Sequence, residues 1–207
     1  MMNAVNATSK LNESKRQQIL DGARQVFMDN GYAAASMERI AKTAGVSKGT
    51  LYNYFENKES LFVCLIQSEC GKSEELSAPV RQYSDAPPEP ILNQIGQQWL
   101  IGLLQPNQRA LFRIVLAECM QFPELGQAIE RSGPQLAMQG LGQYLAHLNQ
   151  RGILRIPDIE LATEQFFALC DAGITRKMHF SVSEPTEAQI IAHVKSAVTV
   201  FLNGYRV

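Results

Sequence analysis

Helical periodicity runs through almost all of this 207-residue chain and limits its fold more than any other feature of the sequence. Apolar residues recur three and four positions apart in most segments, and no run alternates apolar and polar residues as a half-buried strand would. Only the Pro-rich stretch at 77–90 lacks a period, and it predicts a loop. The pattern predicts about nine helices and no sheet, so we expect an all-α fold.

Composition supports a folded chain without a membrane span. Hydrophobic residues make up 45% of the sequence, which is enough for a sizeable core. The longest apolar stretch, WLIGLL at 99–104, is too short to cross a bilayer, and the polar N-terminus lacks the apolar segment of a signal peptide. We therefore expect a soluble, cytoplasmic protein with no membrane partner.

Neither a metal site nor a catalytic centre is evident in the sequence. The cysteines form no CxxC pair and have no histidine at metal-ligand spacing. Phosphate-binding glycine loops, nucleophile elbows and HExxH motifs are also absent. We expect no enzymatic activity, no cofactor and no metal. Buried free thiols are the favoured interpretation of the four cysteines, with redox sensing as the alternative: Cys64, Cys70, Cys119 and Cys170.

Charge is distributed unevenly along the chain. Residues 1–58 carry eight Lys or Arg and five Asp or Glu, for a net of +3, whereas residues 59–207 carry eleven and fifteen, for a net of −4. A basic first segment fits contact with a polyanion at one end of the molecule. The bias is modest and does not identify the polyanion.

Two short predicted helices meet at the tetrapeptide AGVS within residues 36–55. Ser36 and Ser47 are suitable N-caps, and Gly45 can adopt the positive φ of a tight turn. Such a connection is typical of a helix-turn-helix, in which the second helix presents its N-terminal end to DNA. The outward residues gather at that end: Ser47, Lys48, Gly49, Thr50, Tyr52, Asn53 and Tyr54.

These residue types are suited to contact with DNA. Hydroxyl groups, the Lys48 ammonium and helix N-terminal amides can bind phosphates, and Gly49 allows a close approach of the backbone. Asn53 can pair with an adenine edge, and Lys58 is placed to bind a neighbouring phosphate. A solvated polar corner is the alternative. The joint presence of the turn, the caps and the hydroxyl cluster favours DNA.

One segment resembles the N-terminal domain of TetR/AcrR-type transcriptional repressors over residues 19–62, ILDGARQVFMDNGYAAASMERIAKTAGVSKGTLYNYFENKESLF. The motifs F-x-x-x-G-Y, I-A-x-x-A-G-V-S, G-T-L-Y-x-Y-F and N-K-E-x-L carry the likeness. A second stretch, LFRIVLAECMQFPEL at 111–125, looks like the sixth helix of the AcrR/AefR-like branch. The resemblance implies DNA contacts at Ser36 and Lys58 as well as at the start of the second short helix. Members of this family often have a histidine where this chain has Tyr54.

The resemblance also implies a homodimer, a double-stranded operator with twofold symmetry, and repression relieved by a small hydrophobic effector. We expect a DNA-binding domain at residues 1–57 and a ligand-binding and dimerisation domain at residues 58–207. An alternative keeps the DNA-binding head but has the body bind a protein partner. The operator, the target genes, the effector and the sign of regulation do not follow from the sequence.

Apolar residues of the second domain suggest both a cavity and an interface. Met and aromatic residues favour an effector cavity, with plain core packing as the alternative: Trp99, Phe112, Leu116, Met120, Met138, Leu141, Tyr144, Phe166, Phe167 and Cys170. A stripe on the last helix and small residues on a helix predicted at 158–179 favour a dimer seam: Ala168, Ala172, Ile191, Val194, Val198, Phe201 and Tyr205. Burial of this stripe in the chain's own core is the alternative.

Overall fold

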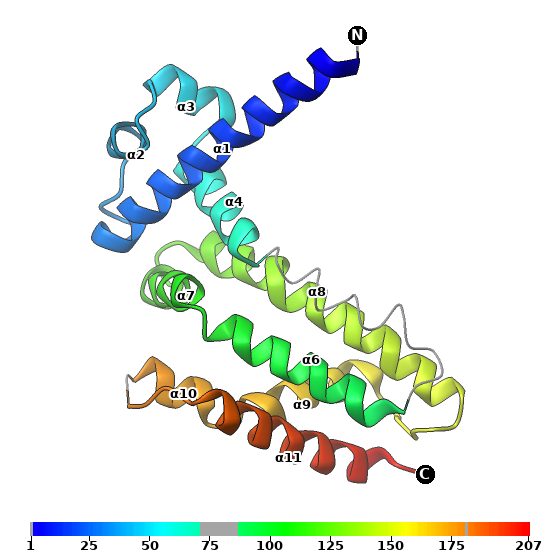
Figure 1. Ribbon diagram of the computed structural model, residues 1–207. Helices are drawn as coiled ribbons and strands as arrows, with labels where there is room; N and C mark the ends of the chain where they lie inside the picture. Colours follow the sequence, from blue (N-terminus) through cyan, green and yellow to red (C-terminus); the bar gives the residue numbers. More distant parts are fainter. Residues whose placement is uncertain (1, 71–86, 181) are drawn as a thin grey trace. The chain divides into compact units, whose positions relative to one another are not determined.

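The computed structural model describes residues 2–70, 87–180 and 182–207. Within these ranges ten helices form, with one isolated bridge between Leu154 and Arg206 and no strand, so the all-α prediction is confirmed (Figure 1). The helices are α1 (Met2–Asn30), α2 (Met37–Thr43), α3 (Lys48–Tyr54), α4 (Lys58–Cys70), α6 (Pro88–Leu103), α7 (Pro106–Glu118), α8 (Pro123–Gln150), α9 (Ile159–Asp171), α10 (Ile174–His179) and α11 (Glu187–Tyr205).

Two stretches differ from the sequence-based expectation. The single helix predicted at 158–179 is divided into α9 and α10, because Gly173 adopts a left-handed φ of 82°. The Asp171 carboxylate stabilises the break by accepting hydrogen bonds from the backbone N–H of Thr175 at 3.2 Å and from its hydroxyl at 2.8 Å. The predicted loop at 77–90 lies outside the described residues up to position 86, and its last three residues form the first turn of α6.

The helices form two compact units. Unit 1 consists of residues 1–69 and 110–129, and unit 2 consists of residues 70–109 and 130–207. Each boundary between the units falls inside a helix: the first at the last residue of α4, the others within α7 and α8. The sequence does not predict the return of 110–129 to unit 1. The functional division at residue 57 stays a prediction.

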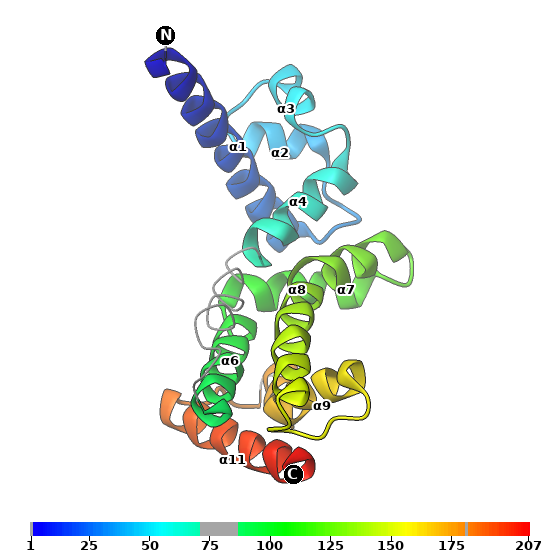
Figure 2. The same cartoon turned by 90° about the vertical axis from the view of Figure 1, so that its right-hand side faces the viewer.

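Aromatic rings join the separate stretches of unit 1. Phe27 on α1 packs edge-on against Phe62 on α4, with ring centroids 4.8 Å apart. Tyr32, just after α1, contacts Phe62 at 5.1 Å and Phe122 at 5.0 Å, and Phe122 belongs to the segment 110–129. The turn that follows α1 is therefore held by α4 and by a part of the chain some 90 residues later (|122−32| = 90). The four helices α1 to α4 can be followed in Figure 2.

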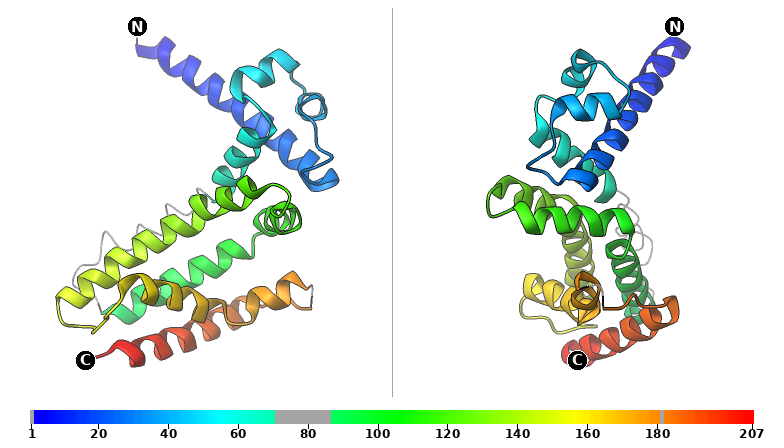
Figure 3. Two further views of the ribbon diagram at one scale, coloured as in Figure 1. Left: turned by 180° about the vertical axis from the view of Figure 1, so that it is seen from behind. Right: turned by 90° about the vertical axis from the view of Figure 1, so that its left-hand side faces the viewer.

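Unit 2 is built on close packing of α6, α9 and α11, which lie side by side in Figure 3. A Cβ placed on Gly96 of α6 would lie 2.7 Å from Val194 Cγ1 and 2.9 Å from Cys170 Sγ, so only glycine permits this approach. Phe166 stacks edge-on against Phe201 at 5.3 Å, and residues of α8 complete the same core. Among the described residues, no helix is both long and apolar enough to span a bilayer.

Candidate nucleic-acid interface

The turn between α2 and α3 is held by hydrogen bonds within itself and to α1. Ser36 starts α2 by accepting a hydrogen bond from the Arg39 N–H at 3.2 Å, and the Ala44 N–H closes the helix on the Ile40 carbonyl at 2.8 Å. Gly45 follows with φ 65°. Gln18 Nε2 of α1 donates to the Ala44 carbonyl at 2.7 Å, so a side chain from α1 holds the turn. The two helices therefore form a helix-turn-helix with a defined orientation on α1.

The start of α3 carries the residues that the sequence singled out. Ser47 is the N-cap, its Oγ accepting from the Thr50 N–H at 3.0 Å and sharing a hydrogen bond with Thr50 Oγ1 at 2.8 Å. The side chains of Ser47, Lys48, Tyr52 and Asn53 are exposed, and Gly49 lies among them. This part of the predicted set is brought together on one helix end.

Lys48 is held by an acidic residue of α2 in the free protein. Its Nζ lies 2.9 Å from Glu38 Oε1, and both side chains are well exposed. The hydrogen bond from Lys48, together with its positive charge, lowers the pKa of Glu38. Exposed ion pairs of this kind contribute little to stability, because water and salt compete with them. A phosphate can therefore replace Glu38 as the partner of Lys48 at small cost.

Tyr54 and Lys58 are less available to DNA than the sequence predicts. The half-buried Tyr54 donates its hydroxyl proton to Asn12 Oδ1 on α1 at 3.2 Å. Lys58 Nζ donates to the carbonyls of Tyr32, Ala33 and Ala35 at 2.7, 3.3 and 3.1 Å, and it lies 4.3 Å from the Tyr32 ring centroid. An ammonium has three donors, so all are used. In the free protein Lys58 therefore fixes the turn after α1, and its contact with a phosphate stays a prediction.

This assignment predicts a stability effect for Lys58→Met, which keeps the aliphatic chain and removes the donors. We expect a loss of about 2 kcal/mol in the free energy of unfolding, because the three carbonyls that now accept from the ammonium would lose their charge-assisted hydrogen bonds. Urea unfolding followed by circular dichroism measures it. Lys42→Met is the control, because Lys42 is exposed at the end of α2 and should change stability little. Equal stability of both variants would contradict the structural role.

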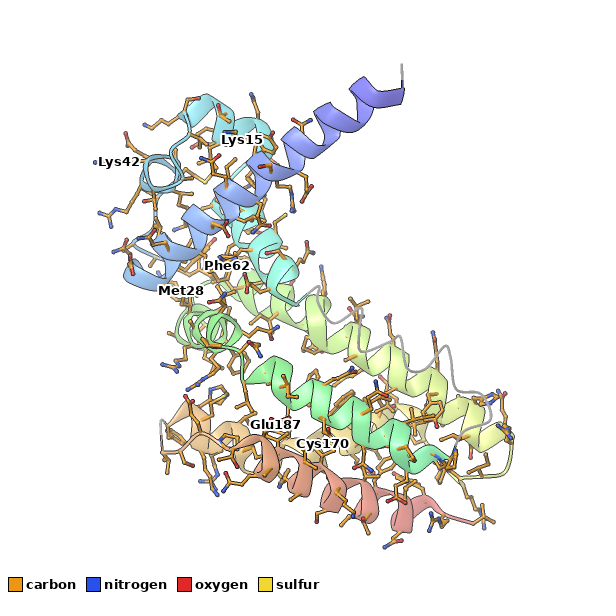
Figure 4. The ribbon with its side chains drawn as sticks, in the orientation of Figure 1. Lys15, Met28, Lys42, Phe62, Cys170 and Glu187 are labelled. Atoms are coloured by element: carbon orange, nitrogen blue, oxygen red, sulfur yellow. The ribbon has the colours of Figure 1, made fainter. Side chains whose placement is uncertain are left out.

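Basic side chains outside the predicted set also lie in this unit. Lys42 points away from α2 into solvent (Figure 4). Arg39 donates to Asn30 Oδ1 at 2.8 Å, and Lys15 of α1 donates to Gln18 Oε1 at 2.9 Å. The net positive charge of residues 1–58 signals such cations, but the sequence does not show which of them face outward.

The ten residues predicted to line an effector cavity fall in both units. Phe112, Leu116 and Met120 belong to the segment 110–129 of unit 1. Leu116 is 53% exposed and Met120 is 92% exposed, so neither lines an interior cavity and both predictions are wrong. Residue type alone does not show which side of a helix faces inward. The other seven share the core of unit 2: Trp99, Met138, Leu141, Tyr144, Phe166, Phe167 and Cys170.

The predicted dimer seam also divides into buried and exposed parts. Val194, Val198 and Phe201 are 0, 0 and 2% exposed in the core of their own chain, so the seam prediction is wrong for them. They face α6 and α9, which the sequence alone could not place against α11. Tyr205 is half-buried and donates its hydroxyl to Gln165 Oε1 at 2.5 Å. The exposed members of the set are Ala168, Ala172 and Ile191.

The cysteines show no redox pair among the described side chains. Cys64, Cys119 and Cys170 are free thiols, and the side chain of Cys70 lies outside the described set. Burial raises the pKa of Cys170 to about 12, with the charge of Asp171 contributing. A thiol that stays protonated is a poor nucleophile, so Cys170 is unreactive at neutral pH.

The fold and the capped pair of short helices define the class of a helix-turn-helix regulator. Residues 19–64 match the family described as bacterial regulatory proteins of the tetR family. Residues 90–207, more than half of the chain, match the family described as the C-terminal domain of AefR-like transcriptional repressors. The chain belongs to the TetR family of bacterial transcription regulators.

Individual relatives agree with this assignment. The transcriptional regulator UidR of Escherichia coli K12 is 28% identical over 150 residues, which are 71% of this chain and 72% of UidR. The repressor AcnR of Corynebacterium diphtheriae is 38% identical over 64 residues, and this match spans only about a third (34%) of AcnR. Solved structures match over nearly the full chain. The flavonoid-responsive regulator FrrA is 31% identical with a TM-score of 0.82, and a TetR-family regulator of Mesorhizobium loti is 26% identical with a TM-score of 0.83. Each match covers 94% of this chain and 98% of the other.

Proposed function

We propose that the protein is a homodimeric repressor that binds a palindromic operator through two helix-turn-helix elements and releases it when a small hydrophobic effector binds unit 2. The observation that carries the proposal is the exposed start of α3. There a capped helix end, two ordered hydroxyls and a weakly held lysine lie together. Backbone N–H groups and cations at a helix start are ligands for phosphate.

Gly49 adds an argument from energy. A glycine inside a helix costs about 1 kcal/mol relative to alanine. A Cβ on Gly49 would meet nothing closer than Ser47 Oγ at 3.8 Å, which is an ordinary contact, and its φ is not in the left-handed region. The chain's own fold therefore gives no reason for glycine here. Close approach of a DNA backbone to α3 supplies one.

The exposed apolar residues of α9 and α11 support the dimer. Ile191 and Val200 on α11 are 43% and 55% exposed, and Leu161 on α9 is 48% exposed. Ala168 and Ala172 lie on the exposed side of the same region and would allow close packing of helices. Two subunits can place their α3 helices in successive major grooves, about 34 Å apart, which gives the operator its twofold symmetry. Such a protein acts in the cytoplasm, where bacterial DNA lies.

The effector is assigned to the core of unit 2, which holds seven of the predicted residues. FrrA, which shares the fold over nearly the whole chain, responds to flavonoids according to its name. An effector can release the operator only if it binds the conformation that fits DNA poorly more tightly than the one that fits DNA well. Repression follows from this scheme when the operator overlaps a promoter.

Selection of bound sequences from a random DNA pool, followed by a salt series, tests the proposal. We expect one palindromic site bound by a dimer, with an affinity that falls steeply as salt rises, because counterions are released from the DNA. Binding that is indifferent to sequence, or absent, would contradict the operator and favour a protein partner for unit 2.

Tyr52→Phe tests the assignment of a phosphate contact on α3. Tyr52 is 52% exposed, so loss of its hydroxyl should not affect folding. We expect weaker binding to the selected operator and to unrelated DNA alike, by about 1 kcal/mol per subunit, since one hydrogen bond is lost. Fluorescence anisotropy measures both affinities. Tyr54→Phe is the matched control, and it should have a smaller effect because its hydroxyl is bonded to Asn12. A loss confined to the operator would show instead that Tyr52 contacts bases.

A further inference from the structure

Glu38 is the one acidic residue of the helix-turn-helix, and its side chain lies on the lysine at the start of α3. Residues 36–55 contain the basic residues Arg39, Lys42 and Lys48 and no acid other than Glu38. Glu38 Oε1 lies 2.9 Å from Lys48 Nζ, and the two side chains are 74% and 58% exposed. A carboxylate repels phosphates, so affinity for the DNA backbone alone gives no reason for an acid at this position.

The stability of the fold gives only a weak reason for this carboxylate. Glu38 lies in the first turn of α2, where its charge interacts favourably with the helix dipole. This interaction and the ion pair with Lys48 are both exposed, so water and salt screen them. The hydrogen bond from Lys48, together with its positive charge, lowers the pKa of Glu38, so the carboxylate is ionised at neutral pH. Glu38 therefore meets DNA as a full negative charge.

The ion pair holds this carboxylate at the end of α3 that faces DNA. Lys48 is the first residue of α3, and the first residues of the second helix of a helix-turn-helix contact base edges in the major groove. When a phosphate takes Lys48 as its partner, Glu38 loses the donor that binds it in the free protein. An ionised carboxylate only accepts hydrogen bonds, so its new partner on DNA must be a donor.

Cytosine is the base whose major-groove edge fits an acceptor. Guanine presents the acceptors N7 and O6 there, thymine presents the acceptor O4, and adenine presents the acceptor N7 beside its N6 amino group. Cytosine presents its N4 amino group with no acceptor on the same base. A carboxylate in the groove is therefore attracted by cytosine and repelled, at least in part, by each of the other bases.

We propose that Glu38 determines sequence specificity by accepting a hydrogen bond from N4 of one cytosine in each operator half-site and by disfavouring DNA that offers no such donor. This inference rests on the proposed function, because it names what the helix-turn-helix recognises in its operator. On unrelated DNA the freed carboxylate faces phosphates without a donor, so Glu38 lowers the affinity that the cations provide for every sequence. Glu38 thus increases the difference in affinity between the operator and other DNA.

Selection from a random DNA pool, carried out in parallel with the full-length wild type and with Glu38→Ala, tests this assignment. We expect one cytosine in each half-site to lose its preference in the variant, while the other preferred bases are kept. Affinity for an unrelated duplex, measured by fluorescence anisotropy, should rise about 2- to 5-fold, because a like charge near the phosphates is removed. Affinity for the wild-type site should fall, so that its preference over the unrelated duplex drops about 10-fold or more.

Glu13→Ala is the matched control. Glu13 is 71% exposed on α1, and its Oε1 lies 4.0 Å from Arg16 Nη1, so its replacement changes the net charge equally. This variant should alter both affinities by the same factor and select the wild-type site. The same selected site for Glu38→Ala and the wild type would overturn the inference, as would loss of preference at a base other than cytosine. A wild type that selects no site would instead reject the proposed function itself, so the two failures are distinguishable.

Discussion

Gly22→Val should strongly destabilise unit 1, and with it the helix-turn-helix proposed to bind the operator. A Cβ on Gly22 of α1 would lie 2.6 Å from the Cβ of Ala44 and 2.7 Å from its Cα and N. Two of these atoms are backbone atoms of the turn between α2 and α3 and the third is a Cβ fixed to it, so no side-chain rotation can relieve the overlap. Valine has a higher helix propensity than glycine, but this gain stabilises the variant by less than about 1 kcal/mol. Overpacking costs about 3 kcal/mol, and this larger effect decides the outcome.

Urea unfolding followed by circular dichroism measures this loss, with all variants at one protein concentration because subunit association affects apparent stability. Gly102→Val is the matched control on α6. A Cβ at Gly102 would have no neighbour within 4 Å, so we expect a change of less than about 1 kcal/mol. A Gly22→Val protein that unfolds at the same urea concentration as the wild type would show that α1 does not pack against the turn in solution.

The helix-turn-helix could be predicted in detail because its signals are local. Ser36 and Ser47 cap helices within three residues of themselves, and Gly45 takes the positive φ that the turn requires. The helical period indicates which side of each short helix faces inward, and Ile40 and Leu51 on those sides are fully buried. These features depend only on residues that are close together in the sequence, so the sequence alone shows them.

A residue's role is not visible in the sequence where it depends on partners far along the chain. Lys58 has the position of a phosphate ligand in sequence, but its ammonium binds three carbonyls about 25 residues earlier (58−33 = 25). Glu118 accepts a hydrogen bond from the Ala33 N–H at 3.2 Å, 85 residues away, so α7 takes part in the first unit. Gly22 gives no sign in the sequence that Ala44 lies against it.

The last helix shows the same limit. α11 has apolar residues on more than one side, and periodicity does not say which side meets the chain's own core. Val194 and Ile191 lie three residues apart on α11, yet one is 0% and the other 43% exposed. Contact of α11 with α6 and α9 decides between them. The exposed apolar residues Ile191 and Val200 lie on two other sides of α11, because they are nine residues, or two and a half turns, apart.

Ile191→Glu combined with Val200→Glu should convert the proposed dimer into a folded monomer. Both side chains are exposed, so the charges should not disturb the core of unit 2. The two side chains lie on opposite sides of α11, so a second copy packed on either side buries at least one of them, where an unpaired carboxylate is strongly unfavourable. Binding one half-site at a time forfeits the gain from linked sites, so operator affinity should fall about 10²- to 10⁴-fold. Substitution of Val194 or Phe201, by contrast, should unfold unit 2.

Sedimentation velocity and circular dichroism separate these results, because a monomer with unchanged helicity identifies an interface and a loss of helicity identifies a core. Ile101→Glu combined with Leu136→Glu is the matched control. These side chains are 44% and 48% exposed, so they add the same charge to similarly exposed apolar positions on helices other than α9 and α11, namely α6 and α8. The control protein should sediment as a dimer and bind the operator as the wild type does. If the Ile191 and Val200 variant were also an intact dimer, the subunits would have to associate through another surface, and the spacing of the two α3 helices would have to be derived from that surface instead.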